Sequence, residues 1–336
     1  MRNDEGALAV AQTSRHHHQH SDVAPPPNVR ALLRVGNEYF LRTLDRLAVM
    51  HGDIVSALVF NAIWTANVKH ITNSGANSNF GSMDDIPPDS VRRPISVLAL
   101  SSSLRIPYET VRRYVQDLLK QGLCVRLGGK GILVPAAVLG RPLFRHAILE
   151  EVPNFLRFLS DIKRCGFDFS PYRQAHINTI ALPADGSPPV NVRALVRVSL
   201  EFIMRGIDTL GRIHEDDLLK GFVFTAIWTA NVRHIAAGAE NLKYGALDAL
   251  PPDEMRRPVT VTAVAGSLRM PYETVRRNTL KLIRQGGAVR VDGKGVIIPR
   301  DRLDVPAQIE GIRESHANFV RMIADLHRAG FDFRNY

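Results

Sequence analysis

The segment Pro107-Tyr-Glu-Thr-Val-Arg-Arg113 decides the fold, because the chain contains it a second time as Pro271-Tyr-Glu-Thr-Val-Arg-Arg277. The two copies are 164 residues apart, and the same offset relates Trp64–Tyr172 to Trp228–Tyr336. A repeat of this length can bury a core of its own, unlike the short units of a solenoid. We therefore expect a duplicated domain whose two halves fold independently.

The repeat divides the chain into four segments. Residues 1–27 are polar, hold histidines at positions 16–18 and 20, and end in three prolines, so we expect a disordered leader. Repeat 1 covers 28–172, segment 173–189 is a Gly, Ser and Pro-containing linker, and repeat 2 covers 190–336. The offset is 163 at the start of the repeats, so one residue has been gained or lost before Trp64.

Apolar residues at helical spacing predict helices over 30–47 and 54–71 in repeat 1. A final helix is predicted over 152–165, with its counterpart over 318–329. Between them, Ser96 and Thr260 are suitable N-caps for a short helix. A longer helix follows at Pro107, and Gly122 ends it. A short helix, a turn and a longer helix are typical of a helix-turn-helix.

A hairpin is predicted directly after each helix-turn-helix. In repeat 1 two short apolar segments flank Gly128-Gly-Lys-Gly131, and in repeat 2 the turn contains Asp292-Gly293, a strong hairpin pattern. This hairpin would be the wing of a winged helix-turn-helix. The expected fold class is therefore mainly α, with two homologous winged helix-turn-helix domains and flanking helices forming a pseudo-dimer in one chain.

The positive charge of the chain is concentrated in these regions. Lysine and arginine exceed aspartate and glutamate by ten over the whole chain. Residues 92–135 hold eight basic and two acidic side chains, a net charge of +6, and residues 256–299 hold nine and two, a net charge of +7. Charge added for solubility would be spread more evenly, so this pattern indicates binding to a polyanion.

The longer helix predicts one buried and one exposed face. At 100° per residue, Arg112, Arg113, Gln116 and Lys120 lie together, opposite Val111, Val115 and Leu118. An arginine can donate two hydrogen bonds to guanine and a glutamate can accept one from cytosine, so an exposed Glu and Arg pair can read a base-pair step. A solvated charged face is the alternative interpretation, which the neighbouring turn and hairpin make less favourable.

The segment Leu104-Arg-Ile-Pro-Tyr-Glu-Thr-Val-Arg-Arg113, followed by Leu-Leu-Lys-Gln-Gly-Leu and a glycine turn, resembles bacterial winged helix-turn-helix regulators of the cyclic-AMP receptor type. The resemblance covers about 44 residues in each repeat and implies that Glu109, Arg113, Glu273 and Arg277 read bases. It also implies that Thr110 and Thr274 hold phosphate. Tyr108 and Tyr272 stand where that family has its first arginine. The order of helices is loosely similar to that of multiple-antibiotic-resistance-type regulators.

We therefore expect a sequence-specific, cytoplasmic and bacterial transcriptional regulator that places two recognition helices on a pseudo-palindromic site in double-stranded DNA. The residues expected to contact DNA are Tyr108, Glu109, Thr110, Arg112, Arg113, Gln116, Lys130, Tyr272, Glu273, Thr274, Arg276, Arg277, Leu280 and Lys294. A replication or partition initiator with tandem winged helices and a winged-helix protein-interaction scaffold are the alternatives. Further homodimerisation and a small-molecule effector stay open.

Several other chemistries find no support in the sequence. No phosphate-binding loop, zinc-ligand spacing or nucleophile motif is present, so we expect neither an enzyme nor a metal or other cofactor. No stretch reaches the roughly 18 apolar residues of a membrane span.

The sequence Ala-Ile-Trp-Thr-Ala-Asn-Val is identical at 62–68 and 226–232, with His70 and His234 close behind. An effector pocket, a second DNA contact and helix packing all fit this motif, and packing is favoured.

Overall fold

The structure is a computed structural model that describes residues 26–73, 80–173, 189 and 191–336. The predicted leader, apart from its last two residues, and the predicted linker, apart from its two end residues, lie outside the described part. The histidines at 16–18 and 20 lie outside it as well. Within the described part the protein is mainly helical, as expected, with two small two-stranded sheets.

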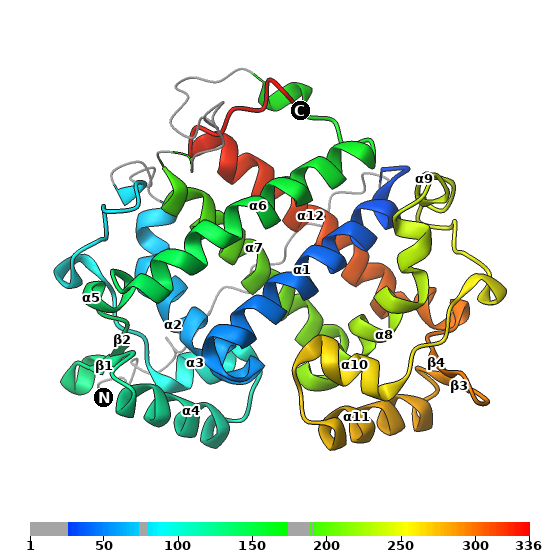
Figure 1. Cartoon of the computed structure of the whole chain (residues 1–336), viewed down its shortest axis with the longest axis horizontal. Coiled ribbons are helices and arrows are strands. Elements are labelled where there is room, and N and C mark those ends of the chain that lie inside the picture. Colours follow the sequence, from blue (N-terminus) through cyan, green and yellow to red (C-terminus); the bar gives the residue numbers. More distant parts are fainter. Residues whose placement is uncertain (1–25, 74–79, 174–188, 190) are drawn as a thin grey trace, which may run out of the picture.

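The long helices, the helix pair and the hairpin follow in the same order in the two repeats, which differ in the placement of one short helix (Figure 1). The main elements of repeat 1 are α1 (Val29–His51), α2 (Ile54–Asn73), α3 (Val97–Leu104), α4 (Tyr108–Lys120), β1 (Val125–Arg126), β2 (Ile132–Leu133), α5 (Ala136–Leu139) and α6 (Pro142–Arg164). Those of repeat 2 are α7 (Val192–Ile213), α8 (Leu218–Ala236), α9 (Glu240–Lys243), α10 (Val261–Leu268), α11 (Tyr272–Arg284), β3 (Val289–Val291), β4 (Gly295–Ile297) and α12 (Pro306–Arg328).

The helix boundaries around the repeated segment follow from the predicted caps. The Ser96 hydroxyl accepts a hydrogen bond from the backbone N of Ala99 (3.1 Å) at the start of α3, and Thr260 does the same for α10. Gly122 adopts φ 64° just after α4, a left-handed conformation that glycine takes at little cost. The strands pair antiparallel, with Val125 opposite Leu133 in repeat 1 and Val289 opposite Ile297 in repeat 2.

The predicted start of the last helix was wrong in both repeats. Helix α6 begins at Pro142 rather than near residue 152, and α12 begins at Pro306 rather than near residue 318. Pro153 lies inside α6, and proline usually marks a helix start, so the pattern favoured a beginning close to it. Buried residues such as Phe144 and Ile148 hold the earlier turns of α6 against the rest of the protein.

One hydrophobic core extends through both repeats, although each repeat is long enough to bury a core of its own. Helix α1 packs against α2 and α6 of its own repeat and against α8, α10 and α12 of the other. Helix α7 likewise packs against α2, α3 and α6 of repeat 1. At the centre, the rings of Tyr39, Phe158, Phe202 and Phe319 from four different helices stack or tilt against one another. The buried apolar residues of the described part thus form one contiguous cluster that both repeats share.

Buried arginines fasten each repeat to the other. Arg34 on α1 donates hydrogen bonds to the Asn241 side chain (2.7 Å) and to the Tyr244 carbonyl (2.6 Å). Its counterpart Arg197 on α7 donates to the Phe80 carbonyl at 2.8 Å. Burial lowers the pKa of both guanidinium groups to about 10, which leaves them charged at neutral pH. Unpaired buried charges are costly, so these contacts specify how the repeats fit together.

The one-residue shift between the repeats lies in the connection before α8. Repeat 1 links α1 to α2 through Gly52, which adopts φ 85°. Repeat 2 has Glu215 and Asp216 in its place, both with positive φ (58° and 59°). A left-handed conformation costs a non-glycine residue roughly 1 kcal/mol, so contacts made by this loop must hold it.

Within the described residues, α2 alone is long and apolar enough to meet the length and composition criteria for crossing a membrane, which the sequence had not indicated. The stretch is Ile54–Thr72, and 72% of it is buried inside the fold. Helices in the core of a soluble protein meet the same criteria, so this observation is weak evidence for a membrane segment.

Candidate nucleic-acid interface

Helices α4 and α11 lie along the same edge of the molecule, on either side of its centre (Figure 1). The β1–β2 and β3–β4 hairpins flank them on the outside, and α6 and α12 cross near the opposite edge. Both helices are exposed on the side facing away from the core. We call this edge, made of α4, α11 and the two hairpins, the α4–α11 surface.

The predicted inward face of each helix is confirmed. Val111, Val115 and Leu118 of α4 are fully buried, as are Val275, Thr279 and Leu282 of α11. This apolar stripe fixes the rotation of the helix about its axis and so decides which side chains face solvent. Ten of the predicted contact residues are exposed: Tyr108, Glu109, Arg113, Gln116, Lys130, Tyr272, Glu273, Arg276, Arg277 and Lys294. The other four, Thr110, Arg112, Thr274 and Leu280, are half-buried.

The glutamate at the start of each helix, which both repeats contain, forms an ion pair with the first arginine of the pair. The second arginine has no carboxylate partner among the described residues. Arg112 lies 2.7 Å from Glu109, and Arg276 makes two hydrogen bonds of 2.8 and 2.6 Å to Glu273. The bonds from Arg276 lower the pKa of the Glu273 carboxyl. Arg113 instead stacks over the Tyr114 ring at 5.3 Å, and neither Arg113 nor Arg277 has an ion pair in the described part of the chain.

The repeats also differ at Tyr114 and its counterpart Asn278, and the sequence predicts both on the exposed face, which is wrong. Asn278 is buried and donates a hydrogen bond from its amide to the Thr274 carbonyl at 2.9 Å. Tyr114 is half-buried and interacts with Asp53, at the start of α2. Their positions on the helix lie at the margin of the apolar stripe, where spacing alone does not settle the direction of the side chain. A second difference does reach the surface: Gln116 is exposed on α4, and its counterpart Leu280 is half-buried on α11.

Not all the arginines of the two basic segments contribute charge to this surface. Arg92 and Arg256 are buried and donate hydrogen bonds to nearby groups, the Pro87 carbonyl at 2.9 Å and Asp253 at 2.8 Å. The remaining positive charge of the α4–α11 surface comes from the exposed or half-exposed residues Arg112, Arg113, Lys120, Arg126, Lys130, Arg276, Arg277, Lys281, Arg284, Arg290 and Lys294.

A groove separates α11 from its hairpin. Tyr272, Arg276 and Leu280 line one side, and Arg290 and Lys294 line the other. Its volume is about 510 Å³, and its charged lining residues are all basic. An open, positively charged groove of this kind suits an extended anionic strand such as a nucleic-acid backbone.

The repeated Trp, Asn and His motif divides into a packing part and a cavity part. Asn67 is buried, and its amide donates to the Arg93 carbonyl (2.8 Å) while its oxygen accepts from the backbone N of Val134 (2.9 Å). Asn231 makes the equivalent bonds in repeat 2. These amides hold each hairpin against α2 or α8, which confirms the packing interpretation for the asparagines. The two tryptophans line cavities described below.

Sequence reasoning missed two arginines that connect the repeats close to α4 and α11. Arg105, between α3 and α4, pairs with Asp208 (3.1 Å) and Asp216 of repeat 2. Arg269 pairs with Asp45 of repeat 1 at 2.5 Å. Both arginines adopt a positive φ (51° and 48°), which is uncommon for a residue other than glycine. No local sequence pattern marks them. Because Arg105 and Arg269 immediately precede the entry to α4 and α11, these pairs help to fix the distance between the two helices.

Comparison with known proteins identifies no relative: no protein-family model, no curated protein and no solved structure matches the chain. Among the described residues, no group of three or more histidine, cysteine, aspartate or glutamate side chains could hold a metal ion.

Proposed function

We propose that the protein is a sequence-specific DNA-binding transcriptional regulator made of two winged helix-turn-helix units in one chain. The observation that carries this proposal is the α4–α11 surface itself. Two helices with the same Glu-Arg-Arg set lie on one edge, each beside a hairpin with a lysine at its tip. Their pseudo-symmetric placement suits the two-fold symmetry of an inverted repeat in duplex DNA.

The proposed mechanism assigns different tasks to the two kinds of basic residue. The unpaired guanidinium groups of Arg113 and Arg277 would donate two hydrogen bonds each to guanine in successive major grooves. Lys130 and Lys294, at the tips of the hairpins, would contact phosphate and fix the register of the protein on DNA. The carboxylate of Glu109 is held by Arg112 in an orientation fit to accept a hydrogen bond from cytosine.

A charge-reversal experiment tests this proposal. The change Arg113→Glu with Arg277→Glu should abolish binding to duplex DNA, because it removes two positive charges and places two negative charges at the bases and phosphates. The matched control is Arg157→Glu with Arg321→Glu, equivalent exposed residues on α6 and α12. Binding is measured by fluorescence anisotropy over a range of salt concentrations.

The unmodified protein and the control should bind DNA with an affinity that falls steeply with salt, as expected when bound counterions are released. Equal losses in the two double variants would show that the α4–α11 surface is not the DNA-binding surface. Absence of salt-sensitive binding by the unmodified protein would contradict the function and favour a protein-interaction scaffold.

A further inference from the structure

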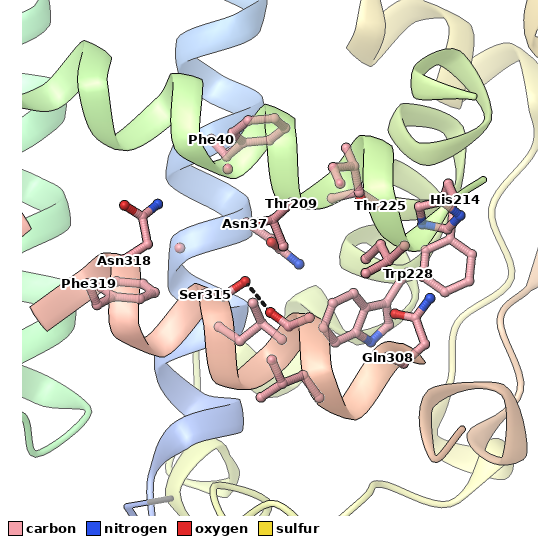
Figure 2. Close-up of a pocket in the computed structure, with 18 of the residues that line it drawn as sticks. Asn37, Phe40, Thr209, His214, Thr225, Trp228, Gln308, Ser315, Asn318 and Phe319 are labelled. Atoms are coloured by element: carbon pink, nitrogen blue, oxygen red, sulfur yellow. Dashed lines mark hydrogen bonds between the residues drawn. The ribbon is translucent and has the colours of Figure 1, made fainter. Parts of the chain in front are cut away.

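Two pseudo-equivalent cavities lie where the repeats meet, and each is lined by one of the two tryptophans of the chain. The repeat 1 cavity lies among α1, α2, α6 and α7 and includes Trp64. The repeat 2 cavity lies among α7, α8, α12 and α1 and includes Trp228 (Figure 2). Each is therefore built by three long helices of one repeat and the first helix of the other.

The two cavities differ in charge. The repeat 1 cavity is bordered by Arg46, Glu150 and Glu151, and the Glu151 carboxylate accepts a hydrogen bond from the Tyr39 hydroxyl at 2.6 Å. At the equivalent position in repeat 2 stands Ser315, and all the polar side chains lining that cavity are uncharged types. A ligand of the repeat 2 cavity would therefore find no charge to pair with, and a charged ligand would lose its hydration without compensation.

One buried polar atom of the repeat 2 cavity has no hydrogen-bond partner among the described residues. His214 is buried, and its Nε2 atom makes no hydrogen bond. The side chains of Asn37, Thr225, Trp228 and Gln308 lie around the same space (Figure 2), and those of Asn37 and Gln308 are half-buried, so that their amides remain open to solvent or to a ligand. Buried polar groups are normally hydrogen-bonded. Burial lowers the pKa of His214 to about 4, so its ring is neutral at pH 7 and offers one donor and one acceptor.

The shape and size of the repeat 2 cavity restrict its occupant. Its volume is about 80 Å³, far below the several hundred Å³ of a site for a drug-sized ligand and below the roughly 150 Å³ of a closed cavity that holds benzene. The cavity is open to solvent on one side, so a single ring would bind with part of its edge in the opening. Its apolar walls include Phe40, Phe202 and Phe224, and Trp228 presents a further aromatic ring. Aromatic walls with a few hydrogen-bonding groups between them fit a single planar ring that carries its own donors and acceptors.

The wall of this cavity is connected to both candidate recognition helices by one short loop, residues 214–217. His214 lines the cavity. Asp216 pairs with Arg105, at the entry to α4, and Asp217 accepts a hydrogen bond from Lys281 of α11 at 2.7 Å. The loop also contains the extra residue of repeat 2 and its two left-handed residues. A change at His214 thus has a direct path to α4 and α11.

We propose that the repeat 2 cavity binds a small, uncharged, planar heteroaromatic molecule, and that its occupancy alters DNA binding through the 214–217 loop. The second half of this inference rests on the proposed function, whereas the first half does not. The molecule would donate to or accept from the ring nitrogen of His214 and the amide groups of Asn37 and Gln308. A bound ligand that repositions His214 would favour one arrangement of the loop and so of the two helices.

The tryptophans provide a direct binding test. In Trp64→Phe, Trp228 is the one remaining tryptophan, so its emission reports on the repeat 2 cavity. Nicotinamide, an uncharged ring with an amide, and uracil serve as probes, and nicotinate, which has nearly the same shape but a negative charge, is the matched control. For molecules this small a dissociation constant on the order of 1 mM is expected. Nicotinate should bind at least about tenfold more weakly, because its carboxylate finds no partner.

Paired variants separate a specific site from general quenching. His214→Phe keeps an aromatic ring but removes the nitrogen and should weaken binding about tenfold, whereas His51→Phe, the equivalent change in repeat 1, should leave it unchanged. Thr225→Val, which keeps the shape of the side chain, gives a second check if His214→Phe fails to fold. Absence of a saturable response to both probes, or equal affinities in the two histidine variants, would overturn the binding site.

The coupling is tested on the complete protein with duplex DNA. Saturating probe should change the apparent affinity for DNA about fivefold or more, a usual size for allosteric coupling, and His214→Phe should remove the change. If the probe binds without any effect on DNA affinity, the proposed coupling is overturned, but the proposed binding site is not. A protein that binds the probe but no DNA would refute the proposed function alone.

Discussion

Arg113 and Arg277 differ from their neighbours in a way that the spacing of residues did not reveal. Arg112 and Arg276 occupy the same exposed turn, yet each is engaged by the glutamate three residues earlier. The sequence predicted four arginines and two glutamates as one set of contacts. Five of these six side chains are exposed and Arg112 is half-buried, but spacing does not show which arginine pairs with the glutamate.

Replacing the unpaired arginines should separate base reading from simple attraction. Arg113→Ala or Arg277→Ala should cost about 1–3 kcal/mol on the target site and relax the preference at one base pair. Lys130→Ala is the control, because a phosphate contact should weaken binding to all sequences and flatten the logarithmic salt dependence by about one. Affinities for target and random duplexes measure both effects. Equal losses on both duplexes for Arg113→Ala would show that it contacts only phosphate.

A pH-dependent loss of stability is predicted for His51. Its ring packs 4.6 Å from Phe60, and burial lowers its pKa from 6.5 to about 4. Because the folded-state pKa is depressed, the stabilising contribution is present above pH 6.5 and is lost as the pH falls towards 4. The shift corresponds to about 3 kcal/mol at most. His51→Phe should therefore make the fall in stability between pH 7 and 4 less steep, with the contribution of His214 remaining, as measured by urea unfolding. An unchanged profile would mean that His51 is protonated as readily in the fold as in the unfolded chain.

At the scale of elements, the sequence predicted well wherever one local rule decided the outcome. The caps at Ser96 and Thr260, the stop at Gly122 and the hairpins all depend on residues within a few positions. The early turns of α6 and α12 depend on packing against helices far away in sequence. The role of Asn67 in holding the hairpin likewise depends on contacts with residues 26 and 67 positions away, which no local pattern encodes.

The difference between α4 and α11 predicts an asymmetric DNA site. Gln116 is exposed on α4, and its counterpart Leu280 lies half-buried in the groove beside the β3–β4 hairpin. Glutamine can make two hydrogen bonds to adenine, whereas leucine can make only an apolar contact, such as one with the methyl group of thymine. Leu280→Gln should therefore make the selected site more symmetric, which sequencing of enriched DNA would measure. The same site preference before and after the change would contradict this assignment.

The whole molecule is organised by the contact between its repeats. Sequence alone showed that the chain is duplicated, and the length of each half suggested two separate cores. The shared core was not predictable, because an apolar helix face does not say whether it packs on its own repeat or on the other. The first helices, with Arg34 and Arg197 buried against the opposite repeat, are the clearest case. The relative position of α4 and α11 is thus set by packing rather than by the linker.

This packing predicts the behaviour of a half-chain. Residues 28–172 alone would expose the apolar and arginine-containing faces that α1 and α2 present to repeat 2. We expect this fragment to be unfolded or to form a homodimer that reproduces the pseudo-symmetric core. Circular dichroism and light scattering at several concentrations distinguish these states. A fragment that remains a folded monomer with a cooperative unfolding transition would show that each repeat has a sufficient core.

Selection of DNA from a random pool by the complete, unmodified protein is the measurement that tests the account most directly. Two helices fixed on one edge should enrich an imperfect inverted repeat whose half-sites are centred about one helical turn apart, within a protected region of roughly 20 base pairs. The half-sites should share a core and differ at their outer positions. Two results would contradict the reading of one site by α4 and α11 together. One is that no sequence is enriched, and the other is that direct repeats without inverted symmetry are enriched.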